Sequence, residues 1–457
     1  MKQMRVEDVW PLSPLQEGLL FHALYDEQVV DVYAAQRILD LEGVLDTGVL
    51  RASWEALLAR HASLRAGFRQ PAGAPQLVQV IMRQVALPWR EVDLSDLSED
   101  EAVAEAEHLA EEERERRFDF AKPPLLRLLL VKLNAGCHRL VITLHHVVMD
   151  GWSMPVLMRE WLTIYAAGGT ADGLPPVTPY REYLAWLARQ DKEAAREAWQ
   201  EALAGVEEAT LVAPADRDAA GVMPGEAVAH AGEQLAERLR AVAREHGLTL
   251  NTLVQGAWGL LVGKLTGRRE VVFGATVAGR PAELPGVENM LGLFINTVPV
   301  RVSLDPAQTM IEMLGGLQDR QAALLPHQHL SLTEIQRAAG AGAGFDTLIM
   351  YENYPVDPTD ARTHGSLTLT GAAVEDAAHY PLTLAVVPAD GLELRLDYRP
   401  DVFDEAAAEA LVGRLVRVLE QVAADPCVRV GRVGVLGDVE RRLVLADWND
   451  TVVSVPG

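Results

Sequence analysis

The stretch 140–153, LVITLHHVVMDGWS, places two adjacent histidines at the end of an apolar run, with an aspartate and a glycine shortly after them. Residues 140–144 alternate little between apolar and polar side chains, which predicts a strand buried on both faces. Neighbouring residues of an extended chain point to opposite faces, so one imidazole can face the interior while the other faces a reaction channel. Histidine titrates near neutral pH, so the outward-facing ring is a candidate for proton transfer.

The aspartate and the glycine of this stretch each suggest a structural role. A carboxylate so close in sequence to the histidines can be held by an arginine and so shape the loop. Gly151 removes a side chain where the backbone must approach something closely, or where φ must be positive. A histidine pair taken alone is more often structural than catalytic, so the pattern by itself leaves both interpretations open.

Length and composition indicate a two-domain globular protein. The chain has 457 residues, of which 49% are hydrophobic and 23% charged, which is enough apolar material for two cores. A net charge of −24 disfavours binding to nucleic acid or to an anionic membrane. Only two cysteines are present, which excludes a disulfide framework and a four-thiolate zinc site.

The same survey predicts a cytoplasmic protein. The N-terminal residues MKQMRVEDVWPLSP have no apolar core of a signal peptide. No stretch approaches the roughly 18 apolar residues that a membrane span requires. No third ligand at metal-binding spacing accompanies the histidine pair, and no serine-hydrolase elbow or glycine-rich phosphate loop occurs.

Periodicity predicts a mixed α/β chain divided by the Gly/Pro-rich stretch 166–179. Ser98 is a predicted helix N-cap, with Glu101 at the capping-box position. The polar run beyond the stretch is expected to lead into a second α/β region from about residue 230. The expected helices are 15–25, 47–61, 99–116, 154–165, 180–204, 233–246, 251–266 and 404–423. The expected strands lie near 76–85, 125–133, 138–144, 270–275, 293–303, 346–352, 366–371, 381–387 and 392–398.

Several motifs together carry a family resemblance. HHVVMDG matches the HHxxxDG signature of the chloramphenicol-acetyltransferase-like acyltransferases. Other stretches resemble, in order along the chain, further motifs of the condensation domains of nonribosomal peptide synthetases. They are PLSPLQEGLLFH (11–22), RHASLRAGF (60–68), VVFGATVAGRP (271–281), LGLFINTVPVRV (291–302), PHQHLSLTEIQ (326–336) and YRPDVFD (398–404).

The resemblance implies an α/β (α+β) fold of two acetyltransferase-like lobes, a V-shaped pseudo-dimer with a central tunnel. The lobes are expected at 1–175 and 176–440, with a floor-loop crossing near 275–297 and a latch crossing within 366–390. Residues 441–457 resemble the start of a linker to a downstream adenylation domain. The implied partners are an upstream donor and a downstream acceptor peptidyl carrier protein, whose phosphopantetheine arms carry the substrates. No directly bound cofactor and no metal is implied.

The family pattern also assigns roles to individual residues. His146 is expected to accept a proton from the attacking amine, or to orient the amine and stabilise the tetrahedral intermediate, while His145 is mainly structural. Asp150 is expected to pair with Arg65 and Gly151 to leave room for the pantetheine arm. Arg280 and Asn296 are expected to be structural. The residues expected along the substrate tunnel are Trp152, Ser153 and Asn353. For Asn353 the structural alternative, a turn asparagine before Tyr354 and Pro355, is equally open.

The implied reaction is peptide-bond formation between two carrier-bound substrates, with an L-configured donor. An epimerization domain is the first alternative, but that class usually reads HHxxxDxxSW, whereas this chain reads DGWS at 150–153. A heterocyclization domain would carry aspartates in place of both histidines. The non-enzymatic alternative is a carrier-docking module without turnover, in which replacing His146 would change nothing.

Overall fold

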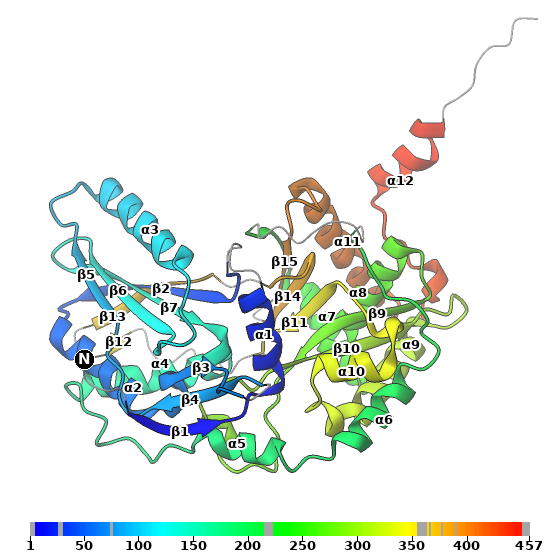
Figure 1. The fold of residues 1–457 in the computed structure, drawn as a ribbon. Helices are drawn as coiled ribbons and strands as arrows, with labels where there is room; N and C mark the ends of the chain where they lie inside the picture. Colours follow the sequence, from blue (N-terminus) through cyan, green and yellow to red (C-terminus); the bar gives the residue numbers. More distant parts are fainter. Residues whose placement is uncertain are drawn as a thin grey trace, which may run out of the picture.

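The computed structural model describes residues 5–25, 31–73, 76–213, 223–353, 363–364, 367–375, 378–388 and 391–449. Two α/β lobes lie side by side in Figure 1, with helix α1 (Pro14–Tyr25) between them. Each lobe is built on a six-stranded mixed sheet, and a small three-stranded sheet accompanies the first lobe. The described part of the chain contains no helix long and apolar enough to cross a membrane.

The sheet of the first lobe has the strand order β12-β13-β2-β7-β6-β5, and the small sheet has the order β1-β4-β3. The predicted strand at 138–144 is confirmed as β7, which is central and ends at His145. The strands of this lobe are β1 (Val6–Trp10), β2 (Ala34–Gly43), β3 (Ala66–Arg69), β4 (Val78–Met82), β5 (Trp89–Asp93), β6 (Leu126–Lys132), β7 (Cys137–His145), β12 (Thr363–His364) and β13 (Leu367–Glu375).

Both faces of β7 are covered, as its continuous apolar run predicts. Leu140, Ile142 and Leu144 belong to the main core of the lobe. Val141 faces the opposite side, where it packs in a second cluster beneath helix α3. The predicted capping box of Ser98 and Glu101 at the start of α3 is confirmed. The helices of this lobe are α1, α2 (Thr47–Arg60), α3 (Glu99–Glu115), α4 (Ser153–Ala166) and α5 (Tyr180–Leu187).

The sheet of the second lobe has the order β10-β9-β11-β14-β15-β8. Helices α7, α8, α9 and α11 share one core with it, and α6 and α10 contribute to a smaller cluster. The strands are β8 (Gly225–Ala231), β9 (Glu270–Val277), β10 (Asn296–Ser303), β11 (Thr347–Tyr351), β14 (Leu382–Pro388) and β15 (Leu392–Tyr398). The helices are α6 (Lys192–Ala202), α7 (Glu233–Glu245), α8 (Leu250–Thr266), α9 (Met310–Leu324), α10 (Leu332–Ala339), α11 (Glu405–Ala424) and α12 (Asp438–Leu445).

The helix predicted at 180–204 is wrong as a single element. It is two helices, α5 and α6, because Asp191 caps a new helix by accepting from the backbone N–H groups of Glu193 and Ala194. Tyr180, Tyr183 and Leu184 of α5 pack in the core of the first lobe. The predicted boundary between the two lobes, at residues 175 and 176, stays a prediction. Because α5 packs in the first lobe, a boundary near residue 190 would fit the packing better.

Two segments from the second half of the chain enter the first lobe. The floor segment, residues 278–295, connects β9 to β10, and its side chains Val287, Met290, Leu291 and Phe294 lie in the first lobe's core. The latch strand, β13, pairs with β2 over its whole length, although the next strand, β14, belongs to the second sheet. The two lobes are therefore joined through shared secondary structure and a shared core.

A buried charge cluster lies between helices α2 and α4. Glu160 accepts from the Arg60 guanidinium at 2.8 Å and contacts Nε2 of His61 at 2.6 Å. Burial alone would raise the pKa of Glu160, but the hydrogen bonds and charges of His61 and Arg60 outweigh it and lower this pKa to about 2. These contacts give the RH pair at 60–61 a structural function.

We expect Glu160→Gln to lower the free energy of unfolding by about 2 kcal/mol at pH 7, because a buried ion pair loses one partner. A carboxylate with a lowered folded-state pKa stabilises the fold fully above its unfolded pKa of about 4.3, and this contribution is lost as the pH falls toward 2. Urea unfolding between pH 7 and pH 3 should therefore show the difference shrinking below about pH 4.3.

The control is Glu55→Gln, which removes an exposed partner of Arg51 and should cost under about 0.5 kcal/mol. A Glu160→Gln effect that stays constant across this pH range would contradict the assignment.

Candidate active site

The double histidine lies where β7 ends and a short 3-10 turn (His146–Val148) begins. The backbone N–H of His145 donates to Leu125 O, and that of His146 donates to Tyr33 O at 3.0 Å. His145 is fully buried, whereas His146 is half-buried. The two neighbouring side chains therefore occupy different environments, and the expected position of His146 at a channel stays a prediction.

Each ring nitrogen of His145 has a polar neighbour. Nδ1 accepts the backbone N–H of Val147 at 3.0 Å, and Nε2 faces a carboxylate oxygen of Asp31 at 3.2 Å. Burial lowers the pKa of His145 despite the opposing effect of Asp31. The ring is therefore neutral, with its proton on Nε2, and Phe120 packs edge-on against it with centroids 4.8 Å apart. Because His145 is fully buried, neither ring nitrogen is accessible to a substrate.

Asp31 is a site residue that the sequence motifs do not identify. Burial alone would raise its pKa, but the contact with His145 and the backbone N–H of Tyr33 outweigh burial and lower it. The carboxylate is therefore ionised beside a neutral imidazole. No motif marks Asp31, because its partner lies more than 100 residues further along the chain.

Asp150 is almost completely buried, at 1% exposure, and the loop is built around its carboxylate. One oxygen accepts from Ser153 N–H at 2.9 Å and from the Arg280 guanidinium at 3.2 Å. The other accepts from the backbone N–H groups of Phe294 and Ile295 at 2.8 and 3.2 Å. This number of donors compensates the cost of burying the charge.

The predicted pairing of Asp150 with Arg65 is wrong. The Arg65 guanidinium donates instead to the carbonyls of Leu58, Ala59 and Met82, and it pairs with Glu7 at 2.9 Å. Arg65 thus ties the end of α2 to the small sheet. The arginine that holds Asp150 is Arg280 of the floor segment, which agrees with the structural role expected of Arg280.

Arg280 is positioned by its own surroundings. It donates to Val287 O and Met290 O, and its guanidinium lies 3.9 Å above the Phe294 ring. Gly279, immediately before it, has φ +59°, and a Cβ there would lie only 1.8 Å from Phe294 O. Only glycine fits at that point, which accounts physically for the glycine of the VAGRP stretch.

Ser153 does not line a substrate tunnel, so that prediction is wrong. Its side chain is fully buried, and Oγ lies within hydrogen-bond distance of Asp150 Oδ1 and Gly292 O. Oγ also accepts from Gly292 N–H and Arg280. Ser153 therefore belongs to the contacts that hold the loop against the floor segment.

The other predicted residues differ in how closely they approach this loop. Gly151 lies in the turn before α4, where its carbonyl accepts the N–H of Met154, and Trp152 is half-buried at the start of that helix. Asn353 is exposed after β11. Asn296 holds the carbonyls of Gln328 and Leu330, a structural contact. The tunnel roles of Trp152 and Asn353 stay predictions.

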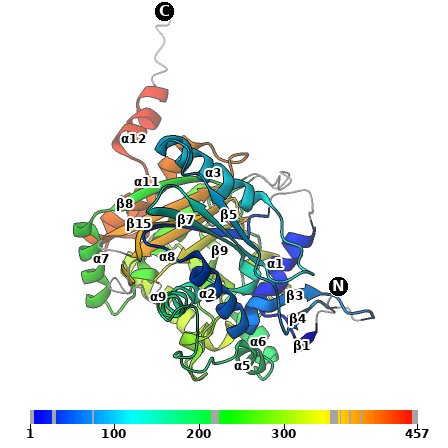
Figure 2. The ribbon, with the colours of Figure 1, turned by 90° about the vertical axis from the view of Figure 1, so that its left-hand side faces the viewer.

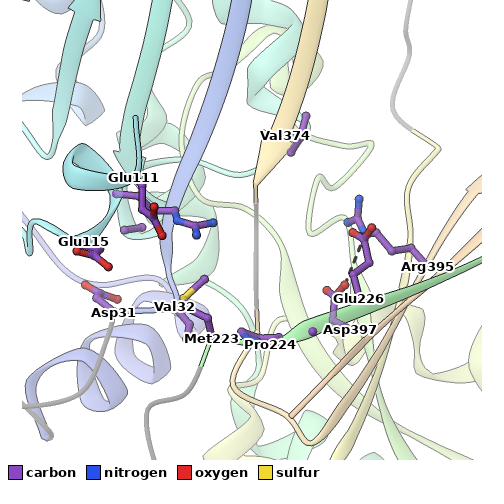
Figure 3. Close-up of a pocket in the computed structure, with 13 residues that line it drawn as sticks. Asp31, Val32, Glu111, Glu115, Met223, Pro224, Glu226, Val374, Arg395 and Asp397 are labelled. Atoms are coloured by element: carbon purple, nitrogen blue, oxygen red, sulfur yellow. Dashed lines mark ion pairs between the residues drawn. The ribbon is translucent and has the colours of Figure 1, made fainter. Parts of the chain in front are cut away.

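Two cavities are lined by both lobes. The smaller, of about 190 Å³, lies in Figure 3 between Asp31, Glu111 and Glu115 on one side and Glu226, Arg395 and Asp397 on the other. Asp31, whose carboxylate faces His145, is one of its lining residues. The larger, of about 780 Å³, is lined by α1, β4 and α5 and by the second-lobe residues Lys192, His329, Ser331 and Glu334.

Comparison with known proteins identifies the family. The condensation domain model matches residues 6–445. The chain belongs to the condensation domain family. This condensation domain is 36% identical over 99% of its length to a linear gramicidin synthase protein of Brevibacillus parabrevis, of which it covers 6%. It is 32% identical over 99% of its length to bacitracin synthase 3 of Bacillus licheniformis, of which it covers 7%.

This condensation domain spans only 6% to 35% of the length of these and similar curated relatives. The resemblance to nonribosomal peptide synthetase condensation domains is confirmed at the level of family.

Solved structures confirm the predicted fold. The first condensation domain of the calcium-dependent antibiotic synthetase, solved with a substrate analogue, has a TM-score of 0.75 and 21% identity, covering 94% of this chain and 100% of that chain. The X-domain from teicoplanin biosynthesis, solved in complex with OxyB, has a TM-score of 0.79 and 25% identity, covering 95% and 98%. The α/β fold with two acetyltransferase-like lobes is therefore correct.

A double-mutant cycle should separate the two candidate partners of Asp150. We expect Asp150→Asn and Arg280→Gln to be coupled by about 1–3 kcal/mol in urea unfolding, because the two side chains share a buried contact. Asp150→Asn and Arg65→Gln should be additive within about 0.5 kcal/mol. Strong coupling to Arg65 in place of Arg280 would contradict the assignment.

Proposed function

We propose that this condensation domain forms a peptide bond between two substrates held as thioesters on carrier proteins. The α-amine of the acceptor aminoacyl group attacks the carbonyl carbon of the donor thioester. The new C–N bond forms as the C–S bond breaks, the donor carrier leaves as a thiol, and the proton lost by the amine ends on that sulfur.

The observation that carries this proposal is the unequal state of the two histidines. His145 is neutral and fully buried, whereas His146 is only half-buried, so His146 is the more accessible imidazole of the pair. We assign to His146 the role of accepting a proton from the attacking amine, or of orienting the amine and stabilising the tetrahedral intermediate. Gly151 would leave room beside it for the pantetheine arm.

Asp150 would act indirectly in this reaction. Its carboxylate is buried and occupied by Arg280 and by three backbone N–H groups. It would therefore be poor as a direct acid or base and would serve by keeping the loop in shape.

The proposed partners are peptidyl carrier proteins upstream and downstream, each bringing its own phosphopantetheine arm. The two cavities lined by both lobes are our candidates for the openings through which the arms reach His146. We propose no bound metal, and the described residues contain no group of three or more His, Cys, Asp and Glu side chains placed to hold one.

We also propose that the C-terminal part leads to an adenylation domain in the same synthetase. Helix α12 stands away from the body of the molecule in Figures 1 and 2 and is tied to α11 by the Arg414–Glu440 pair. Val439, Leu445 and Trp448 are at least 63% exposed, which suits a segment covered by a neighbouring domain. Residues 450–457 of the predicted linker lie outside the described residues.

We expect His146→Ala to reduce carrier-to-carrier transfer by about 10²–10⁴-fold, as loss of a general acid–base or stabilising group does. One carrier is loaded with an L-aminoacyl pantetheine and a second with another amino acid, and intact-protein mass spectrometry follows the dipeptidyl acceptor. The matched control is His108→Ala, which removes an exposed histidine of α3 and should leave the rate unchanged.

A docking module is the second candidate function, because the X-domain structure shows this fold in complex with another protein. In that case both carriers bind, no dipeptide forms, and His146→Ala changes nothing. An epimerization domain would instead invert the donor in place without transfer.

We expect an L-configured donor to be transferred at least about tenfold faster than its D-enantiomer, which corresponds to about 1.4 kcal/mol of discrimination in the transition state. Parallel reactions with donor carriers that differ only in this stereocentre measure the ratio. A preference for the D-donor would refute the assignment of stereochemistry and leave the reaction type untouched.

A further inference from the structure

The short segment 31–33 contacts both histidines and the connection that follows the latch strand. Asp31 faces Nε2 of His145 and also accepts the backbone N–H of Tyr33 at 3.2 Å. The Tyr33 carbonyl accepts the backbone N–H of His146 at 3.0 Å. The Tyr33 hydroxyl forms a short hydrogen bond with Nδ1 of His379. Asp31 and Tyr33 thus join His145 and the 3-10 turn His146–Val148 to a distant part of the chain.

His379 lies between the latch strand β13 and β14, where the chain passes from the first sheet to the second. Its ring packs between His22 of α1 and Tyr380, with centroids 4.1 Å from each. Tyr380 in turn stacks on Phe345 of the second lobe. The imidazole is therefore held by contacts with both lobes.

The protonation states of Tyr33 and His379 identify the donor and the acceptor of the hydrogen bond between them. Burial lowers the pKa of His379 to about 3, so the ring is neutral at pH 7 and has one nitrogen free to accept. Burial also raises the pKa of Tyr33, so its hydroxyl keeps the proton. Tyr33 is thus the donor, Nδ1 of His379 is the acceptor, and the imidazole proton is on Nε2.

Tyr33 has little freedom to move. Its side chain is 8% exposed and packs in one cluster with Leu19 of α1 and Leu293 of the floor segment. Its backbone N–H is bonded to Asp31, and its hydroxyl is bonded to His379. A displacement of the ring would move the carbonyl of the same residue, which is the acceptor for His146.

We propose that Tyr33 is a positioning residue for His146, and that His379 completes this arrangement by accepting the hydrogen bond of the Tyr33 hydroxyl. The catalytic consequence rests on the proposed function of His146, but the positioning contact can be tested without any turnover.

Hydrogen exchange of the His146 backbone N–H is the direct test, read by mass spectrometry with fragmentation that resolves single amides. Tyr33→Phe removes the hydroxyl, and His379→Phe keeps a ring but removes Nδ1. Both should speed exchange of this amide by about fivefold, the effect of losing one hydrogen bond. His379→Asn, whose side chain offers a polar atom near the Nδ1 position, should restore exchange to within about twofold of wild type.

Tyr380→Phe is the matched control, since it removes a phenol hydroxyl from the residue next to His379 and leaves the Tyr33–His379 pair intact. It should exchange like wild type. Unchanged exchange in both Tyr33→Phe and His379→Phe would overturn the proposal. An equal increase in Tyr380→Phe would also overturn it, because it would indicate general loosening of the connection.

Carrier-to-carrier transfer then gives the catalytic readout. Tyr33→Phe and His379→Phe should lower kcat by about fivefold to tenfold with KM for both carriers unchanged, because only the geometry at His146 is altered, and His379→Asn should recover most of the loss. A rise in KM with kcat unchanged would overturn the positioning role. If wild type transfers nothing, the proposed function fails, and the exchange of the His146 amide still decides whether Tyr33 holds the turn.

Discussion

The buried carboxylate of Asp150 is the constraint on which the arrangement of the site depends. A charge that is 1% exposed persists only if donors surround it. The donors here come from its own turn and from the floor segment, which belongs by connectivity to the second sheet. The shape of the double-histidine loop and the position of the floor segment therefore depend on each other, and neither is a property of one lobe alone.

A similar set of contacts separates the two histidines. Asp31 and the Val147 N–H together fix one tautomer of His145, while the backbone of His146 is held through Tyr33. A buried ionised carboxylate beside a neutral imidazole orients the ring without charging it. The ring of His145 therefore shapes the turn. His146 is positioned through its main chain, and its imidazole is half-buried.

Local patterns predicted the local structure well. The apolar run 140–144 became a strand covered on both faces, and the capping box at Ser98 formed as expected. Strand β2 lay outside the predicted strands because it mixes charged and apolar residues. Its Asp40 pairs with Arg139 on the neighbouring strand, a partner that the local pattern does not contain. The partner of Asp150 could not be read from its motif either, since Arg280 is 130 residues away and Arg65 offered an equally charged alternative. Sequence patterns within a few residues predict turns and the buried faces of helices and strands. Long-range ion pairs depend on tertiary packing, which no short motif contains.

The entry of the floor segment and β13 into the first lobe has a consequence for biosynthesis on the ribosome. When synthesis has reached the end of α5, the first lobe has all its helices but lacks strand β13 and the core side chains of residues 287–294. The emerging chain would expose the open edge of β2 and an unfilled core until most of the second lobe has been made. The two lobes, which look like separate domains, therefore complete their folding together.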